Sequence, residues 1–218
     1  MKLSELKKLT NNELASRFPF IVVREYNGEL AKDEDGNYYL EIDGMHGWRD
    51  LLLCWAEKVK PIYDSITDEN LKNNFYLMDV KEKWGSLRID VSCIPTPKID
   101  EYTSMAEHLS EWACLRCGKI TKSSNSKHII VYHEGRNVEI PFCKDCAKKD
   151  SAEDWKKFPM CHQLWIQHSK NPVKAIYSTL KRVEGDWYAR FRSWKPDGST
   201  MYIKYDCREL LEGMDYGS

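Results

Sequence analysis

The stretch EWACLRCGK, residues 111–119, places two cysteines, Cys114 and Cys117, at the spacing Cys-x2-Cys. A second pair with the same spacing, Cys143 and Cys146, follows in PFCKDCAKK after 25 intervening residues. A gap of two residues lets each chain turn tightly, so that both sulfurs of a pair face one ion. Four thiolates from two such turns suit tetrahedral Zn²⁺, with Zn–S distances of ~2.3 Å. The spacing therefore predicts a structural Zn²⁺ site made by these four cysteines.

The residues between the two pairs have the pattern of a β-hairpin. The segment KHIIVYHEGRNVEIPF contains a predicted strand at 128–133, a turn at 134–137 and a second predicted strand at 138–142. A hairpin of this kind brings distant cysteine pairs together in zinc ribbons and treble-clef fingers. Gly118, directly after the first pair, supplies the permissive backbone that a tight turn tends to need.

Other functions of the cysteines fit the pattern less well. A thioredoxin-like redox centre uses a single Cys-x2-Cys in a βαβ setting. An iron–sulfur cluster also takes four cysteines, but the spacing and the hairpin favour zinc. A catalytic zinc needs an open coordination position, which four thiolates do not leave. His128, His133 and Asn137 are residue types of His-Asn-His nucleases, yet the two histidines bracket the apolar run HIIVYH instead of opening a ββα arrangement.

The composition is that of a globular protein. The chain has 218 residues, 42% of them hydrophobic and 12% aromatic, which is ample for a buried core in one large or two small domains. Lysines and glutamates interrupt the start, and eighteen apolar residues never run together, so we expect neither a signal peptide nor a membrane span. The eight cysteines are too sparse for a disulfide framework, and a cytoplasmic protein is expected.

The charges are distributed unevenly. Residues 1–111 carry 14 Lys and Arg against 21 Asp and Glu, whereas residues 112–170 carry 11 against 6. A tetrathiolate zinc site would subtract about two charges from the second segment. That segment is then only mildly basic, so the electrostatic case for nucleic-acid binding is weak.

Residues 1–111 predict an α+β domain. Expected helices cover 3–16, 47–60 and 99–113, and expected strands cover 18–26, 36–42, 75–80 and 85–92. Asp35-Gly36 predicts a hairpin turn, and Pro61 is expected to kink or restart the second helix. That helix carries one apolar stripe, at Trp48, Leu51, Leu52, Trp55 and Val59. Cys54, beside the stripe, is interpreted as a small buried apolar residue.

Residues 151–218 predict a helix at 151–171, followed by a three-stranded antiparallel meander over 174–206. In the last two strands, alternation separates an apolar face from a basic and aromatic face. The second face is a candidate binding surface for nucleic acid or an acidic protein, formed by Tyr188, Arg190, Arg192, Trp194, Tyr202 and Lys204. Plain cross-strand pairing on a solvated face explains the same pattern.

The predicted fold is therefore α+β, in three parts. The first is the α+β domain at 1–111. The second, at 112–150, is a zinc-binding segment with four cysteine ligands and a hairpin like that of a zinc ribbon or treble clef. The third, at 151–218, is the helix with the antiparallel β-meander.

Four motifs along residues 40–150 resemble those of small phage and prophage proteins. They are MHGWRDLLLCW, VKEKWGSLRIDVS, MAEHLSEWACLRCG and PFCKDCA, in matching order and spacing. The second motif corresponds to a strand signature of that group at Lys81, Glu82, Lys83, Gly85, Leu87 and Arg88, with Trp84 where phenylalanine is usual. The resemblance implies a phage-type origin, and hence a bacterial host cytosol, together with a zinc fold. It implies no reaction, because this group is functionally uncharacterised.

The strand signature also contains candidate partner contacts, at Lys81, Lys83, Trp84 and Arg88. The simpler interpretation is a charged turn in which Trp84 packs as an anchor. No phosphate-binding loop, dinucleotide-binding motif, zinc-protease motif or nucleophile elbow occurs, so the sequence supports no enzymatic activity.

We therefore expect a non-enzymatic zinc protein of phage type that binds a host or phage protein and acts, for example, as an inhibitor of a bacterial defence complex. The alternatives are a nucleic-acid-binding module and, with less support, a His-Asn-His-like nuclease.

Overall fold

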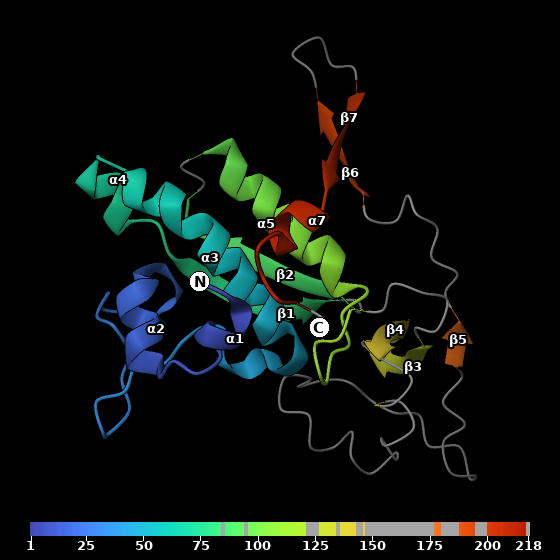
Figure 1. Ribbon diagram of the computed structural model, residues 1–218, viewed down its shortest axis with the longest axis horizontal. Coiled ribbons are helices and arrows are strands. Elements are labelled where there is room, and N and C mark those ends of the chain that lie inside the picture. Colours follow the sequence, from blue (N-terminus) through green and yellow to red (C-terminus); the bar gives the residue numbers. More distant parts are fainter. Residues whose placement is uncertain are drawn as a thin grey trace.

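The computed structural model describes residues 1–83, 86–93, 96–120, 127–133, 136–142, 146, 177–179, 188–194 and 200–216. For the strands between residues 127 and 205 it describes the backbone and its pairing. The described part combines helices with antiparallel strands, which confirms the α+β class (Figure 1). The predicted helix at 151–171 lies outside the described residues.

The first predicted helix is divided in two. α1 (Leu3–Leu6) and α2 (Asn11–Arg17) are separated by residues 7–10. The Thr10 hydroxyl accepts a hydrogen bond from the Glu13 amide (3.2 Å), and the Glu13 carboxylate accepts one from the Thr10 amide (2.7 Å). This reciprocal capping box starts a new helix at residue 11. The prediction of one continuous helix was therefore wrong.

The segment 18–26 is irregular where a strand was predicted. It begins with the short 3-10 helix η1 (Pro19–Ile21) and continues with isolated bridges from Val22 to Leu40 and from Arg24 to Leu30. Phe20 and Ile21 are buried, so the apolar character of this segment reflects its place in the core and not a regular ladder. The predicted turn at Asp35-Gly36 is present, with Gly36 in the left-handed region at φ +85°.

Two helices, α3 (Arg49–Ser65) and α5 (Pro97–Ser110), form the centre of the core. α3 follows the 3-10 helix η2 (Asp43–Trp48) and precedes the short α4 (Glu69–Asn73). Every residue of the predicted stripe is fully buried, namely Trp48, Leu51, Leu52, Trp55 and Val59. The helix continues past Pro61 to its end at Ser65. The helical periodicity therefore predicted the buried face correctly.

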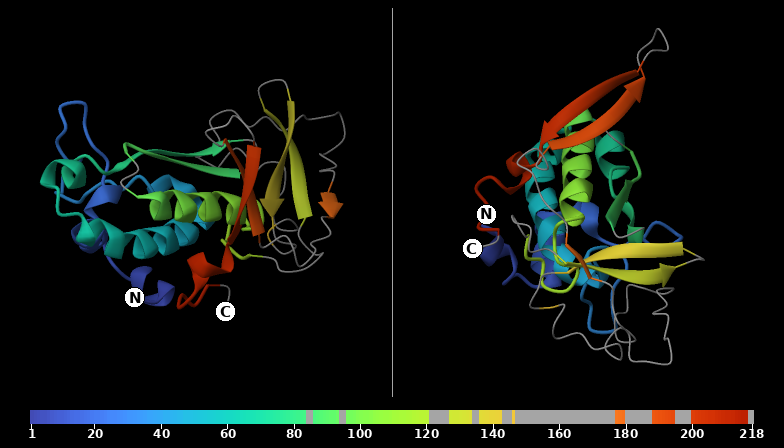
Figure 2. Two further views of the ribbon diagram at one scale, coloured as in Figure 1. Left: turned by 90° about the horizontal axis from the view of Figure 1, so that it is seen from above. Right: turned by 90° about the vertical axis from the view of Figure 1, so that its right-hand side faces the viewer.

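The strands β1 (Leu77–Lys83) and β2 (Ser86–Val91) pair in an antiparallel hairpin along the two helices (Figure 2). Leu87 and Ile89 are buried while Asp90 is exposed, as the alternation predicted. Side chains of α5 accept hydrogen bonds from the β2 backbone: Ser110 from the Leu87 amide (2.8 Å) and Glu107 from the Ile89 amide (2.9 Å). The helix that leads to Cys114 is thereby fastened to the sheet.

The predicted hairpin between the cysteine pairs is present as β3 (Lys127–His133) and β4 (Arg136–Phe142). A third strand, β5 (Tyr177–Thr179), pairs with β3, so the sheet order is β4-β3-β5. The meander predicted over 174–206 placed this strand beside the later two, and that part of the prediction is not confirmed. β3 offers a second edge of unpaired backbone groups, and pairing with β5 satisfies part of it.

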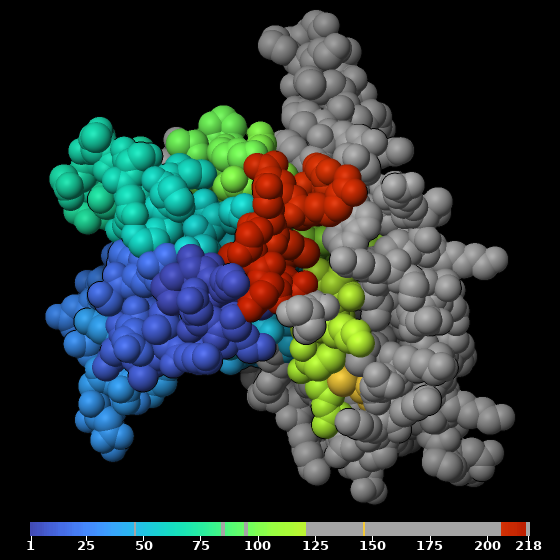
Figure 3. Space-filling view, viewed as in Figure 1, coloured from blue at the N-terminus to red at the C-terminus, as the bar shows by residue number. Residues whose placement is uncertain are grey.

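The strands β6 (Tyr188–Trp194) and β7 (Thr200–Asp206) form a separate two-stranded ribbon. Figure 1 shows this ribbon projecting from the body of the molecule near α5. Its chain then returns through α7 (Arg208–Leu211), whose Leu210 is fully buried. In Figure 3, residues 206–216 lie between the N-terminal residues and the segment that carries the first cysteine pair.

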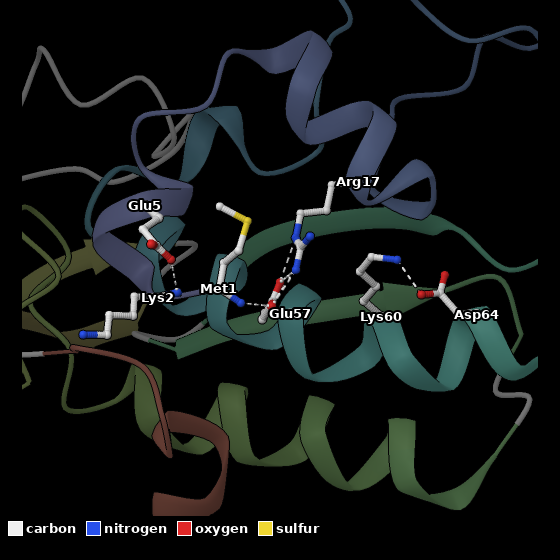
Figure 4. Close-up of polar contacts among 7 residues, drawn as sticks. All are labelled: Met1, Lys2, Glu5, Arg17, Glu57, Lys60 and Asp64. Carbon is white, nitrogen blue, oxygen red and sulfur yellow. Dashed lines mark hydrogen bonds and ion pairs between the residues drawn. The ribbon is translucent and has the colours of Figure 1, made fainter.

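The N-terminal segment is held to α3 by polar contacts at Glu57 (Figure 4). The Arg17 guanidinium donates hydrogen bonds of 2.6–2.9 Å to the Glu57 carboxylate, which also pairs with the Met1 ammonium group. Burial alone would raise the pKa of Glu57, but the hydrogen bonds from Arg17 and the ammonium group outweigh it and lower the pKa.

Within the described residues, no helix has the length and apolar character that crossing a membrane requires.

Candidate metal centre

The first cysteine pair lies in a tight turn directly after α5. The Gly118 amide donates to the Cys114 carbonyl (2.8 Å), and the Cys114 amide donates to the Lys119 carbonyl (3.0 Å). Ala113 and Ile120 form a bridge that closes the turn. Gly118 has φ +76°, a conformation that residues with a Cβ rarely adopt. The predicted need for glycine after this pair is thus confirmed.

The turn is docked on the residues that precede α3. The Gly47 amide donates to the Leu115 carbonyl (2.9 Å), and the Trp48 indole donates to the Ala113 carbonyl (3.1 Å). Cys114 and Leu115 are 1% and 0% exposed. Cys114, the first cysteine of this pair, is therefore part of the hydrophobic core. No periodic pattern in the sequence indicates this contact, although the motif MHGWRDLLLCW contains both donors.

The C-terminal segment covers the other side of the turn. The Tyr216 hydroxyl donates a 2.6 Å hydrogen bond to the Gly118 carbonyl. Burial holds the pKa of the Tyr216 phenol well above its usual range, so the hydroxyl keeps the proton that it donates. Sequence periodicity carries no signal for this contact, because the two residues are 98 positions apart.

Three of the four predicted ligands come together. The sulfur atoms of Cys114, Cys117 and Cys146 all lie within 4.8 Å of one another. Tetrahedral zinc with Zn–S distances of ~2.3 Å places its sulfurs roughly 3.8 Å apart, close to this arrangement. The three thiols can therefore hold a metal ion. Cys143, the fourth predicted ligand, lies outside the described residues.

Thiolate donors suit a soft or borderline metal ion. The three cysteines differ in their access to solvent. Cys114 and Cys146 are buried, whereas Cys117 is exposed. Cys117 lines a cavity of about 570 Å³ together with Lys7, Lys8, Asp50, Lys119 and Tyr216. Solvent and chelators can thus reach the centre from the side of Cys117.

Other cysteines of the described part take no place in this cluster. Cys54 is fully buried on α3, as interpreted from the sequence, and burial raises the pKa of its thiol. Cys207 is also fully buried, beside α7, and Cys93 is half-buried with its sulfur 3.5 Å from the Asn74 carbonyl oxygen. Among the described cysteines, the three at Cys-x2-Cys spacing come together, and the three without a partner at that spacing lie outside the cluster.

The histidines considered for a nuclease are separated by the geometry of β3. His128 pairs with Pro141 and His133 with Arg136, at opposite ends of the ladder. Five residues of strand span about 16 Å, so the two positions are far apart along the backbone of β3. The nuclease alternative, centred on His128 or His133, stays a prediction.

The candidate contacts of the Lys-Glu-Lys motif lie on the β1–β2 hairpin. Lys81 forms ion pairs with Asp79 and, at 3.0 Å, with Asp90. The Arg88 guanidinium lies 3.9 Å from the Glu107 carboxylate. Lys83 pairs in the ladder with Ser86, and Trp84 lies outside the described residues. Lys81 and Arg88 thus have acidic partners within the protein itself, which favours the simpler structural interpretation of this motif.

The candidate contacts of the ribbon share one face. Arg190 pairs directly with Lys204, Arg192 with Tyr202, and Tyr188 with Asp206. Trp194 occupies the last pair, opposite Thr200. Directly opposed positions belong to the same face of a sheet, so the register assigns these six positions to one face of the ribbon. The predicted division of β6 and β7 into two faces agrees with this register.

No protein-family model matches the chain, and comparison with curated proteins and with solved structures gives no match either.

Proposed function

We propose that the protein is a zinc-dependent binding protein of phage type, without enzymatic activity, in which Cys114, Cys117, Cys143 and Cys146 hold a structural Zn²⁺. The convergence of three thiols from two distant segments carries this proposal. Four thiolates around one ion close the coordination sphere, so the ion stabilises a fold of the zinc-ribbon or treble-clef type and does not activate water. Such a centre holds the cysteine-bearing segments in a defined arrangement for recognition.

Metal content tests the first part of the proposal. We expect native mass spectrometry to find one zinc ion per chain, and Cys114→Ser or Cys146→Ser to abolish stoichiometric binding. Cys93→Ser is the matched control, because Cys93 is half-buried and is not part of the cluster. Retention of zinc by both ligand variants would contradict the proposed centre.

The proposed partner is a bacterial host or phage protein, such as a component of a defence complex. The resemblance of residues 40–150 to phage proteins supports this origin, and the projecting ribbon offers a face whose register positions hold three aromatic and three basic residues. Affinity purification from bacterial lysate tests it, with wild type compared with a Tyr188→Ala, Trp194→Ala, Tyr202→Ala variant. A partner that wild type enriches and the ribbon variant loses is expected, and identical partner lists would count against the ribbon as the contact.

Nucleic acid is the second candidate partner, and the register of the ribbon is the specific observation that favours it. Arg190, Arg192 and Lys204 lie on one face, and Asp206 is the acidic residue nearest to them in the ladder. A two-stranded ribbon fits the major groove of duplex DNA. Binding to phosphates predicts an affinity that falls steeply with salt, and a flat salt response in a gel-shift titration would exclude this candidate.

A further inference from the structure

We infer that the protein core positions the first cysteine pair before any ion binds. The ion then links the segment that carries β3, β4 and the second cysteine pair to this preformed half of the site. The inference rests on the proposed zinc centre and adds an order of assembly to it. It predicts a metal-responsive protein whose core persists when the ion is removed.

The first half of the centre is fixed by contacts that need no metal. Backbone hydrogen bonds hold the Cys114–Gly118 turn closed, and the Gly47 amide and Trp48 indole hold it from the side of α3. Tyr216 holds the Gly118 carbonyl from the C-terminal segment. Ala113, Cys114 and Leu115 are at most 1% exposed. Burial of these residues in the core supplies the stabilisation that isolated zinc knuckles obtain from the ion.

Close packing of two glycines makes this docking specific. A Cβ added to Gly47 would lie 2.2 Å from the Cys114 carbonyl oxygen and 2.6 Å from the Gly118 nitrogen. A Cβ added to Gly118 would lie 2.6 Å from the Gly47 carbonyl oxygen. All three of these neighbours are backbone atoms, which cannot rotate away as a side chain can. The turn and η2 therefore fit together only without side chains at these two positions.

The second half of the centre belongs to a segment whose described pairing is internal. β3 pairs with β4 and with β5, and of the described residues that follow this hairpin Cys146 belongs to the buried core cluster and lies at the other two thiols. Figures 1 and 2 show β3 and β4 beside the end of the helical core, next to the turn that follows α5. β5 pairs only with residues 127–129 of β3, so most of the β3–β4 hairpin is two-stranded, and an isolated two-stranded hairpin is only marginally stable in water. The ion is thus placed where the segment meets the core.

Hydrogen exchange of the full-length protein tests the inference directly. We expect amides in 127–142 to exchange at least about tenfold faster after zinc removal by EDTA, because marginal hairpins open readily. Amides of Gly47, Cys114 and Gly118 should change by less than about threefold. Equal loss of protection in both regions, or no change in 127–142, would overturn the inference while leaving a zinc centre in place. A wild-type protein that binds no zinc would overturn both proposals.

The glycine contact gives a second test, with a matched control. Gly47→Ala should weaken zinc binding at least about tenfold in competition with a chromophoric chelator, because the preformed half-site is lost. Gly44→Ala is the control, since Gly44 lies in the same η2 helix and a Cβ there meets nothing within 4 Å. Equal zinc affinity of both variants would contradict the inference.

A milder variant keeps the test informative if Gly47→Ala fails to fold. Tyr216→Phe retains the ring and removes the hydrogen bond to the Gly118 carbonyl. One net hydrogen bond corresponds to about a fivefold effect, so the zinc affinity should fall by about that factor and the Gly118 amide should exchange faster. Tyr102→Phe, which removes the hydroxyl next to Glu209, should leave both unchanged. Unchanged affinity and exchange in Tyr216→Phe would show that the C-terminal segment does not support the half-site.

Discussion

At the scale of single residues, two glutamates of the N-terminal part experience opposite electrostatic environments. Glu41 is half-buried near Asp79, whereas Glu57 is surrounded by the Arg17 guanidinium and the Met1 ammonium group. Burial and the charge of Asp79 raise the pKa of Glu41 to about 7. The pKa of Glu57 is lowered. The two carboxyl groups therefore make opposite contributions to the pH dependence of stability.

Glu41→Gln should stabilise the protein above pH 7. In the unfolded chain this carboxyl has a pKa of about 4.3, so between that value and a pH of about 7 the folded state holds a proton that the unfolded state has lost. Stability consequently falls as pH rises through this window, and glutamine avoids the loss. After allowance for partial exposure, the gain is about 1–2 kcal/mol at pH 8 and near zero at pH 4. Urea denaturation at both pH values measures it, and exposed Glu34→Gln is the control.

Glu57→Gln should have the reverse pH dependence. A carboxyl whose folded pKa is depressed contributes stability above its unfolded pKa and loses that contribution as pH falls through the folded value. Removing this charge leaves the Arg17 guanidinium with a poorer partner, which costs about 1–3 kcal/mol at pH 7. The cost should shrink below pH 4. Asp64→Asn breaks the exposed Lys60–Asp64 pair of the same helix and should cost under about 0.5 kcal/mol (Figure 4).

At the scale of secondary structure, local chemistry decides where elements begin. The Thr10–Glu13 capping box divides one apolar periodic segment into α1 and α2. The stripe on α3 predicted its buried face, because a helix repeats every 3.6 residues whatever it packs against. Segment 18–26 failed as a strand because its apolar residues fill the core without a continuous partner strand. Periodicity is thus reliable where the element is long and weak where burial alone selects apolar residues.

Thr10→Ala should destabilise α2 through loss of its N-cap. The hydroxyl accepts a hydrogen bond from the Glu13 amide, which alanine leaves without this acceptor. The expected loss is about 1 kcal/mol in the free energy of unfolding. Ser16→Ala, at an exposed position within α2, should be neutral or slightly stabilising. An equal effect of both changes in urea denaturation would show that the capping box does not define the start of α2.

At the scale of the whole molecule, the C-terminal segment completes a core that begins at the other end of the chain. Cys207 and Leu210 are fully buried in the same cluster as Leu3 and Leu6. The Ser4 amide donates to the Asp215 carboxylate (3.0 Å), and the Tyr216 hydroxyl donates to Gly118 in the turn of the first cysteine pair. Residues 207–216 therefore pack with the N-terminal unit, although they follow the ribbon in the chain.

Leu210→Ala tests whether residues 207–216 are part of this core. Truncation of a fully buried leucine leaves a cavity, and the expected loss is about 2–4 kcal/mol in the free energy of unfolding. Leu211→Ala, at the neighbouring half-buried position, should cost clearly less. Circular dichroism during urea denaturation measures both variants. A cost below about 0.5 kcal/mol for Leu210→Ala would mean that α7 is not part of the core.

The sequence by itself determined the features that depend on neighbours in the chain. The two-residue spacing identified the cysteines that come together, and helical periodicity identified the buried face of α3. Alternation predicted the two faces of the ribbon. Each of these rules follows from local backbone geometry. Only the tertiary structure decided that Gly47 packs against the first cysteine turn, that β5 joins β3, and that Tyr216 returns to Gly118. These contacts join residues far apart in the chain, where no periodic pattern relates one partner to the other. The raised pKa of Glu41 belongs to the same class, because it depends on burial and on Asp79, a residue of another element.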